Sequence, residues 1–177
     1  MNLVIRDLDN TRIQYEAMIQ RVGEKDANRA FARALSHEGR KGYTAVKRAL
    51  RQQSDIPSTL VNAGIKFKGA RTSELRTVIS GFGSELPLKH FKARQFSYGV
   101  RAKVWGRHQT FKSAFIVKAY DANVFVRKTS KRFPIEKLWG PSIPKELVKD
   151  DSLKAFENSN TQIMDRAMHE LSRILRV

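Results

Sequence analysis

The spacing of apolar residues changes along this chain, and the first part has the spacing of helices. In residues 8–22, apolar side chains recur every three or four positions, which predicts an amphipathic helix that ends at Gly23. A second helix is expected over residues 25–51, with an alanine-rich apolar face. Gly39 and Gly42 lie inside it and predict a kink, because each glycine costs a helix about 1 kcal/mol relative to alanine.

The middle of the chain has the alternating pattern of strands. Residues 97–105 predict a strand with one face in water, since apolar and polar residues alternate there. Residues 111–119 are more continuously apolar and predict a strand that is buried on both sides, and residues 124–128 predict a third strand. Tight turns separate these strands, so we expect an antiparallel meander.

A proline-rich segment then departs from both patterns. Each proline fixes its own φ and keeps the preceding residue out of the helical region. Gly140-Pro141 and Ile143-Pro144 are therefore expected to be extended or in turns, in a strap held across the core by buried Ile135, Leu138 and Trp139. The residues assigned to this strap are Pro134, Ile135, Leu138, Trp139, Gly140, Pro141 and Ile143.

A helical pattern returns over residues 150–175 and predicts one long C-terminal helix. The order of elements predicts an α+β fold. It consists of an N-terminal helical hairpin or long kinked helix, a central small antiparallel β-sheet, the proline-rich strap, and the C-terminal helix packed on the sheet. We expect one domain over residues 1–177, with a helical part (1–56), a β-rich core with the strap (57–147) and a C-terminal helix (148–177).

The net charge of the chain indicates what kind of partner it binds. The 177 residues include 34 Lys and Arg against 17 Asp and Glu, a net charge of +17 that attracts polyanions and opposes self-association. The basic residues occur in every segment, which argues against a basic disordered tail. Cysteine is absent, and neither a signal peptide nor a membrane-spanning run is visible, so we expect a soluble protein made in a cytoplasm, with no membrane partner.

Two groups of basic residues are candidate binding sites. The first lies on the second helix and consists of Arg40, Lys41, Lys47, Arg48 and Arg51. It is either a solvated helix face, a surface that touches DNA phosphates without reading sequence, or a docking face for an acidic neighbour. The second, a candidate partner interface, follows the third strand and consists of Arg127, Lys128, Lys131 and Arg132.

Catalytic chemistry finds little support. The four histidines have no metal-ligand spacing, and Asp150 with Asp151 sits where a helix begins. Two-metal catalysis needs converging carboxylates, which the strands do not offer, and no phosphate-binding P-loop is present. We expect no enzymatic activity, no cofactor and no metal site.

Aromatic residues among cations suggest a different function, a stacking platform for single-stranded nucleic acid. Phe96, Tyr98 and Trp105 lie among Arg94, Arg101, Lys103 and Arg107. Tyr98 is nevertheless two residues from Val100 and six from Val104, so the alternation places it on the apolar face. We therefore expect Tyr98 to pack in the core.

Several short motifs together resemble one known family. They occur in the following order: Pro87-Leu88 and Phe91, Gly99-Val100, Phe111 with Ala114-Phe115, Val124-Phe125 with Arg127, Pro134-Ile135, Leu138, and Gly140-Pro141-Ser142-Ile143. In this order they resemble the minor tail protein Z family of tailed bacteriophages, also called tail completion proteins. The similarity covers about residues 73–147.

The resemblance implies a structural virion protein that completes the tail at its head-proximal end or in the neck, where the tail joins the DNA-filled head. It implies localisation in the virion, after assembly in the host cytoplasm, and no catalytic residues. The implied partners are tail terminator, head-completion or stopper proteins, the tape measure, copies of the chain in a ring, expected to be sixfold, and DNA in the channel. The charge predicts that the isolated chain is a weakly associating monomer.

Two alternatives remain open. One is a free, non-sequence-specific nucleic-acid-binding domain that uses its basic helical surface. The other is an RNA-binding or ribosome-associated protein, although the chain lacks the motifs of the common RNA-binding modules.

Overall fold

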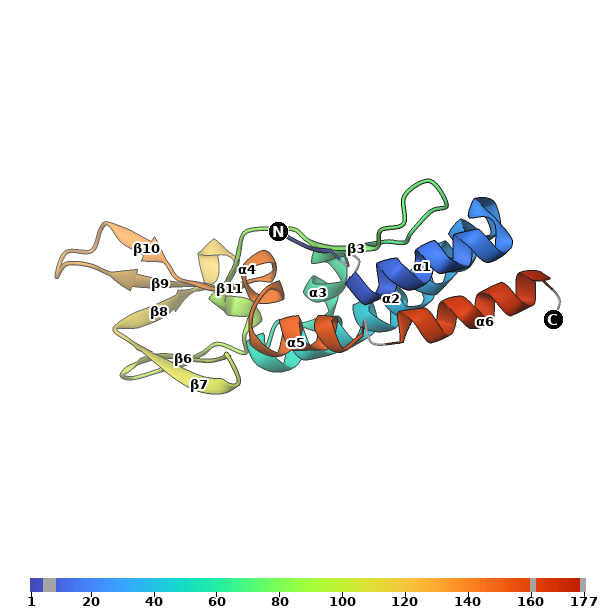
Figure 1. Cartoon of the computed structure of the whole chain (residues 1–177). Coiled ribbons are helices and arrows are strands. Elements are labelled where there is room, and N and C mark those ends of the chain that lie inside the picture. The colour runs from blue at the N-terminus through green and yellow to red at the C-terminus, as the bar shows by residue number, and fades with distance from the viewer. Residues whose placement is uncertain (5–8, 160–161, 176–177) are drawn as a thin grey trace.

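Figure 1 shows the computed structural model, in which most helices lie towards one end of the molecule and the strands of residues 99–137 lie at the other, while the strand at residues 78–81 runs beside the helices. The structure describes residues 1–4, 9–159 and 162–175. The helices are α1 (Asp9–Val22), α2 (Glu24–Ser54), α3 (Ser58–Gly64), α4 (Ile143–Leu147), α5 (Asp150–Asn158) and α6 (Ile163–Leu175). The strands are β1 (Asn2–Val4), β2 (Ile65–Lys68), β3 (Val78–Gly81), β4 (Glu85–Pro87), β5 (Arg94–Phe96), β6 (Gly99–Val104), β7 (Arg107–Lys112), β8 (Ala114–Val117), β9 (Asn123–Arg127), β10 (Ile135–Lys137) and β11 (Trp139–Ser142).

The predicted N-terminal helices are confirmed, and they form a helical hairpin. Gly23, with φ of 87°, turns the chain between α1 and α2. Met18 of α1 is buried against the alanine face of α2, and the Tyr15 ring meets Phe31 edge-on at 4.8 Å between centroids. Residue 8, the predicted start of α1, lies outside the described residues.

Helix α2 continues through Gly39 and Gly42 without a break, so neither glycine ends the helix. A Cβ on Gly39 would lie 2.5 Å from Cγ2 of Thr77, and one on Gly42 would overlap the side chain of Ser159. Both glycines therefore mark places where another segment approaches the helix backbone closely.

Within the described residues, the strands form four small antiparallel sheets, with orders β1-β3-β2, β11-β4, β5-β6-β7 and β10-β9-β8. The predicted single meander is wrong, because β7 and β8 belong to different sheets. Ser113, with φ of 58°, turns the chain between them and breaks the expected 111–119 strand. Phe115, Ile116 and Val117 are only half-buried, so β8 is not covered on both sides.

We call residues 89–139 the β lobe; they contain the β5-β6-β7 and β10-β9-β8 sheets at the left of Figure 1. The main core joins this lobe to the helices, since Leu50 of α2, Val100 of β6 and Val124 of β9 are all fully buried in it.

The predicted C-terminal helix is divided into α5 and α6, and both pack against α2. Phe156 and Ile163 lie in the main core together with strand residues. The α+β class is confirmed. None of the described helices has the length and apolar content needed to cross a bilayer.

The strap is more regular than predicted, and one of its anchors is misassigned. Gly140 and Pro141 are extended in β11, as expected, but Ile143 and Pro144 begin α4, where proline is tolerated in the first turn. Trp139 is 47% exposed, so the prediction that it is buried is wrong. Leu138, between β10 and β11, packs against the core, whereas the ring of Trp139 at the start of β11 faces solvent.

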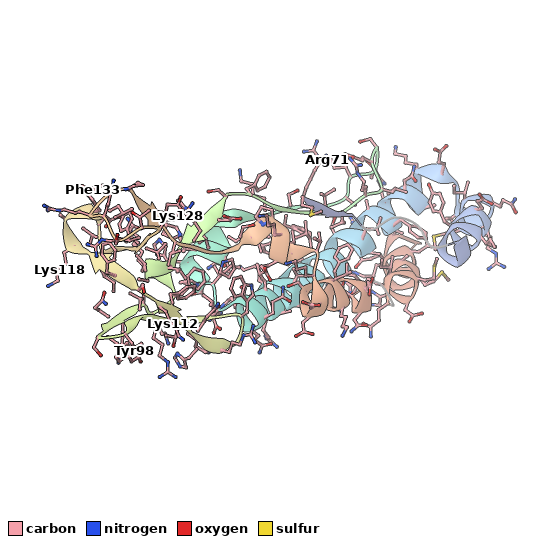
Figure 2. All side chains as sticks on the ribbon, turned by 90° about the vertical axis from the view of Figure 1, so that its left-hand side faces the viewer. Arg71, Tyr98, Lys112, Lys118, Lys128 and Phe133 are labelled. Carbon is pink, nitrogen blue, oxygen red and sulfur yellow. The ribbon has the colours of Figure 1, made fainter. Side chains whose placement is uncertain are left out.

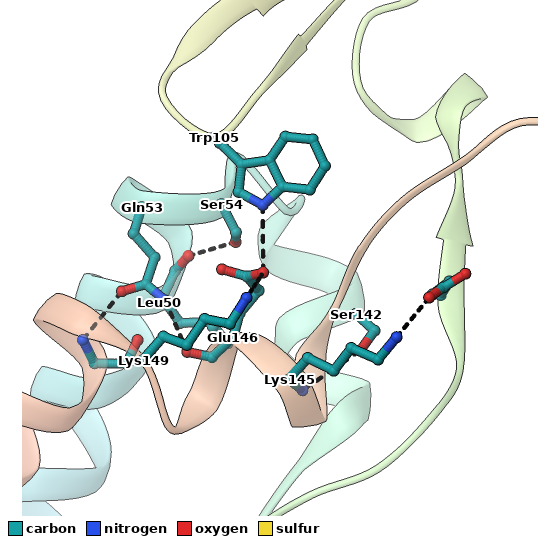
Figure 3. Close-up of polar contacts among 10 residues, drawn as sticks. Leu50, Gln53, Ser54, Trp105, Ser142, Lys145, Glu146 and Lys149 are labelled. Atoms are coloured by element: carbon teal, nitrogen blue, oxygen red, sulfur yellow. Dashed lines mark hydrogen bonds and ion pairs between the residues drawn. The ribbon is translucent and has the colours of Figure 1, made fainter.

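Glu146 of α4 is only 5% exposed, and the hydrogen bonds that it accepts hold the β lobe against the helices (Figure 3). Trp105 Nε1, in the turn between β6 and β7, donates to Glu146 Oε1 at 3.3 Å. Gln53 of α2 donates through Nε2 to the backbone oxygen of Glu146 at 2.7 Å. The end of α2, the β6–β7 turn and α4 are thereby held together.

Candidate functional site

A basic cleft lies where the C-terminal end of α2 meets the β lobe. Its volume is about 580 Å³, which is large enough for a phosphate group with its neighbours. The charged and titratable residues that line it are Arg48, Arg51, Asp55, His90, Lys92 and Lys103. Residues far apart in the sequence therefore converge at this point.

Asp55 organises the cleft and connects its two walls. It follows α2 in the left-handed conformation, with φ of 58°, which aspartate tolerates better than most residues. One carboxylate oxygen, Oδ1, lies 2.7 Å from Nζ of Lys103, and Oδ2 accepts a hydrogen bond from the Gly106 amide at 2.7 Å. Among the described residues that line the cleft, Asp55 is the acidic one, and Lys103 neutralises it.

The remaining charge of the cleft is positive. Arg48, Arg51 and Lys92 are exposed. The negative end of the α2 dipole offsets only about half a unit of their positive charge. Burial, followed by the nearby charge of Lys89, lowers the pKa of His90 below its ordinary value of 6.5, so this ring is neutral at pH 7. The cleft can therefore hold an anion through three cations and one neutral imidazole.

The structure brings two of the five predicted helix residues into the cleft and leaves three outside it. Arg48 and Arg51 line it. The Arg40 guanidinium instead lies 5.5 Å from the centre of the Phe67 ring, Lys41 Nζ lies 2.9 Å from Glu38 Oε1, and Lys47 Nζ lies 4.9 Å from the centre of the Tyr43 ring.

The Lys41 contact belongs to a buried carboxylate site on α2. Glu38 is only 3% exposed, and burial alone would raise its pKa. Hydrogen bonds from Lys41 and His37 outweigh that effect and lower the pKa of Glu38 below its ordinary value. Lys41 therefore has a structural role in compensating this charge.

The four residues predicted as a partner interface lie on β9 and the loop that follows it. Arg127 lies 4.5 Å above the Phe115 ring, and Lys128 forms an ion pair with Glu136 of β10. Lys131 and Arg132 lie in the exposed loop before β10. This loop projects from the end of the molecule opposite the helical hairpin (Figure 1).

The β lobe carries a larger share of the net charge than its length suggests. Basic residues do occur in every segment of the sequence, but the excess of positive charge is concentrated in this lobe. Its 51 residues include 13 Lys and Arg but only two Asp and Glu, so it holds a net charge of +11 out of the total of +17. Both acids, Asp121 and Glu136, are paired with lysines of the same lobe. The signal was present in the sequence, because residues 86–120 contain no Asp or Glu.

Tyr98 is not in the core, contrary to the alternation of its strand. It is 52% exposed and stacks on Phe96, with ring centroids 5.3 Å apart and planes 5° from parallel. Strand β6 begins only at Gly99, whose φ of 141° changes the direction of the chain after Tyr98. The alternation therefore does not extend to Tyr98.

Within the described part of the chain, no group of three or more His, Asp or Glu residues is placed to hold a metal ion. Comparison with protein-family models, with curated proteins and with solved structures finds no match to this chain.

Proposed function

We propose that this chain is a structural virion protein of a long-tailed bacteriophage, which acts in tail completion at the head-proximal end of the tail or in the neck. The observation that carries the proposal is the placement of the motif residues that resemble the minor tail protein Z family. Leu88, Phe91, Val100, Ala114, Val124 and Ile143 are each at most 3% exposed and lie in one core. The resemblance thus concerns residues that specify how the β part folds.

Surface charge supports the same proposal. A neck component must contact neighbouring proteins and surround a DNA channel, and a net charge of +17 suits acidic ring partners or the phosphates of DNA. The same charge disfavours a closed ring of the isolated chain until partners or salt screen it.

Deletion of the gene from the parent phage tests this role. We expect filled heads and completed or nearly completed tails that fail to join, with infectivity restored by supplying the intact chain. The chain should also be present in purified virions. Normal joining in its absence, or virions that lack the chain, would contradict the proposal.

The basic cleft favours a second candidate, a free nucleic-acid-binding domain without sequence specificity. Replacing Arg48 and Arg51, the two helix residues that line the cleft, with glutamine should leave the fold intact, because these side chains lie outside the buried stripe of α2. If the cleft holds phosphates, DNA affinity should fall by a similar factor for every sequence. The dependence of log affinity on log salt should become shallower by up to about 0.9 per lost contact.

The two roles separate in a combined measurement of binding and assembly. The variant with unchanged DNA affinity that fails to join tails to heads would assign the charge to a protein partner. The variant with lost DNA affinity and normal joining would favour the free binding domain.

A further inference from the structure

The solvent face of the β5-β6-β7 sheet is a cationic surface that neither the cleft nor the virion role explains. Residues directly opposite on antiparallel strands share a face, and so do residues two apart on one strand. Three rows of directly opposed residues make up this face: Arg94–Arg101–Thr110, Phe96–Gly99–Lys112 and Lys103–His108. We call these eight residues the cationic sheet face. The other face of β6, with Val100, Ala102 and Val104, is fully buried in the core.

The cationic sheet face has charge but little internal compensation. Arg94, Arg101, His108 and Lys112 are exposed. Within the described part of the chain, Lys103 is the member of this face that forms an ion pair, and its partner is Asp55 of the cleft. A mixture of opposite charges is the usual way in which a solvated sheet face is stabilised, and this face lacks it.

Like charges directly opposite one another destabilise a sheet, and Arg94 lies directly opposite Arg101. This pairing does not stabilise the isolated fold. An anion laid across the strands would remove the repulsion, and the hydroxyl of Thr110 at the end of the row provides a hydrogen-bond donor beside it.

An exposed aromatic pair stands at one edge of this face. Phe96 belongs to the row with Lys112 and is 39% exposed, and Tyr98, in the turn between β5 and β6, is stacked parallel to it. Figure 2 shows Tyr98 and Lys112 at the β end of the molecule. Nucleic-acid bases stack on such rings with little sequence preference, while neighbouring cations hold the backbone.

We propose that the cationic sheet face binds single-stranded nucleic acid, with phosphates over Arg94, Arg101 and Lys112 and a base stacked on the outer ring face of Tyr98. Lys103 belongs both to this face and to the cleft, so a strand that crosses the sheet continues towards Arg48 and Arg51. The flat, open shape of a three-stranded sheet suits an unpaired strand, whose bases are free to stack. The inference does not depend on the virion role.

The first test measures the affinity of the full chain for an unstructured oligothymidylate between about 50 and 200 mM salt. Replacing Arg94 and Arg101 with glutamine should lower the affinity about tenfold and reduce the log–log salt slope by about 1.4, the value expected for two lost contacts to a single strand. Replacing Arg71 and Lys154, exposed cations outside this face, removes the same charge and should have less than half this effect.

A thermal melt of the Arg94→Gln/Arg101→Gln variant excludes unfolding as the cause. Because the substitutions remove a like-charge pair, its Tm at low salt should equal or exceed that of the parent chain. Equal losses of affinity in this variant and in the control would mean that only net charge matters, and would overturn the assignment to this face.

The second test concerns stacking. Tyr98→Ala should weaken binding of the oligothymidylate about tenfold and binding of a duplex of the same length much less, whereas Tyr98→Phe should retain most of the affinity. Equal effects on single strand and duplex would overturn the stacking role. Binding to anionic lipid vesicles but to neither nucleic acid would overturn the proposal and assign the face to a membrane surface.

Discussion

Replacing Gly99 with alanine is expected to destabilise the chain by about 4 kcal/mol, the combined cost of backbone strain and overpacking. Gly99 has φ of 141°, a conformation that side chains other than glycine rarely adopt. A Cβ there would overlap the carbonyl oxygen of Phe111 and lie 3.1 Å from Cα of Lys112. Both atoms belong to the β7 backbone, which is paired with β6, so they cannot move without breaking the ladder. Chemical denaturation of the purified variant measures the loss.

Gly83→Ala provides the matched control. Gly83 also has a positive φ, of 108°, but no atom lies within 4 Å of the position that its Cβ would occupy. This variant carries the strain without the overlap and should cost about 1–2 kcal/mol. Equal losses in the two variants would contradict the view that the β6–β7 pairing leaves no space at Gly99.

Local periodicity in the sequence predicted the elements that are long enough to show it. The helical hairpin and the buried alternation of β6 follow from side chains spaced at the period of their own element, and β9 follows from a run of β-forming residues. Strands of three residues, such as β4, β5 and β10, contain too few positions to show a period. Their existence depends on pairing with partners elsewhere in the chain.

The features that were missed involve contacts between distant segments or single backbone dihedral angles. Gly39 and Gly42 suggested an interruption because the sequence does not reveal that Thr77 and Ser159 approach them. The left-handed conformation of Ser113 divides the expected β-sheet in two, and serine gives no particular signal for it. In both cases the structural cause is absent from the local pattern.

The candidate site was predictable in its chemistry and not in its geometry. Basic residues on α2 indicated an anionic partner, and Arg48 and Arg51 do line the cleft. Lys92 and Lys103 join them through the tertiary fold. The acid-free segment 86–120 was visible in the sequence, and a count of charge along the chain would have directed attention to the β lobe. The outward turn of Tyr98 depends on the dihedral angle of Gly99.

Truncating Phe91 to alanine is expected to cost about 4 kcal/mol, because its ring is 1% exposed and packs against the strap at Gly140. A Cβ on Gly140 would lie 2.8 Å from Cε2 of Phe91, so the ring packs directly on the strap backbone. The carbonyl of Phe91 also accepts a hydrogen bond from the Lys103 amide at 2.9 Å, which connects this residue to β6. The loss would appear as a lower denaturant midpoint.

Trp139→Ala should cost much less, about 1–2 kcal/mol, although the sequence suggested Trp139 as an anchor of the strap. Its ring is 47% exposed, and its cation–π contact with Lys137, at 4.4 Å between Nζ and the ring centre, is a weak surface interaction. Phe133→Ala is the control at an exposed aromatic, 58% accessible, and should change the stability by less than about 0.5 kcal/mol. The expected order of cost is therefore Phe91, then Trp139, then Phe133. If truncation of Trp139 costs as much as truncation of Phe91, the indole is buried in solution and the outward orientation of this side chain is wrong.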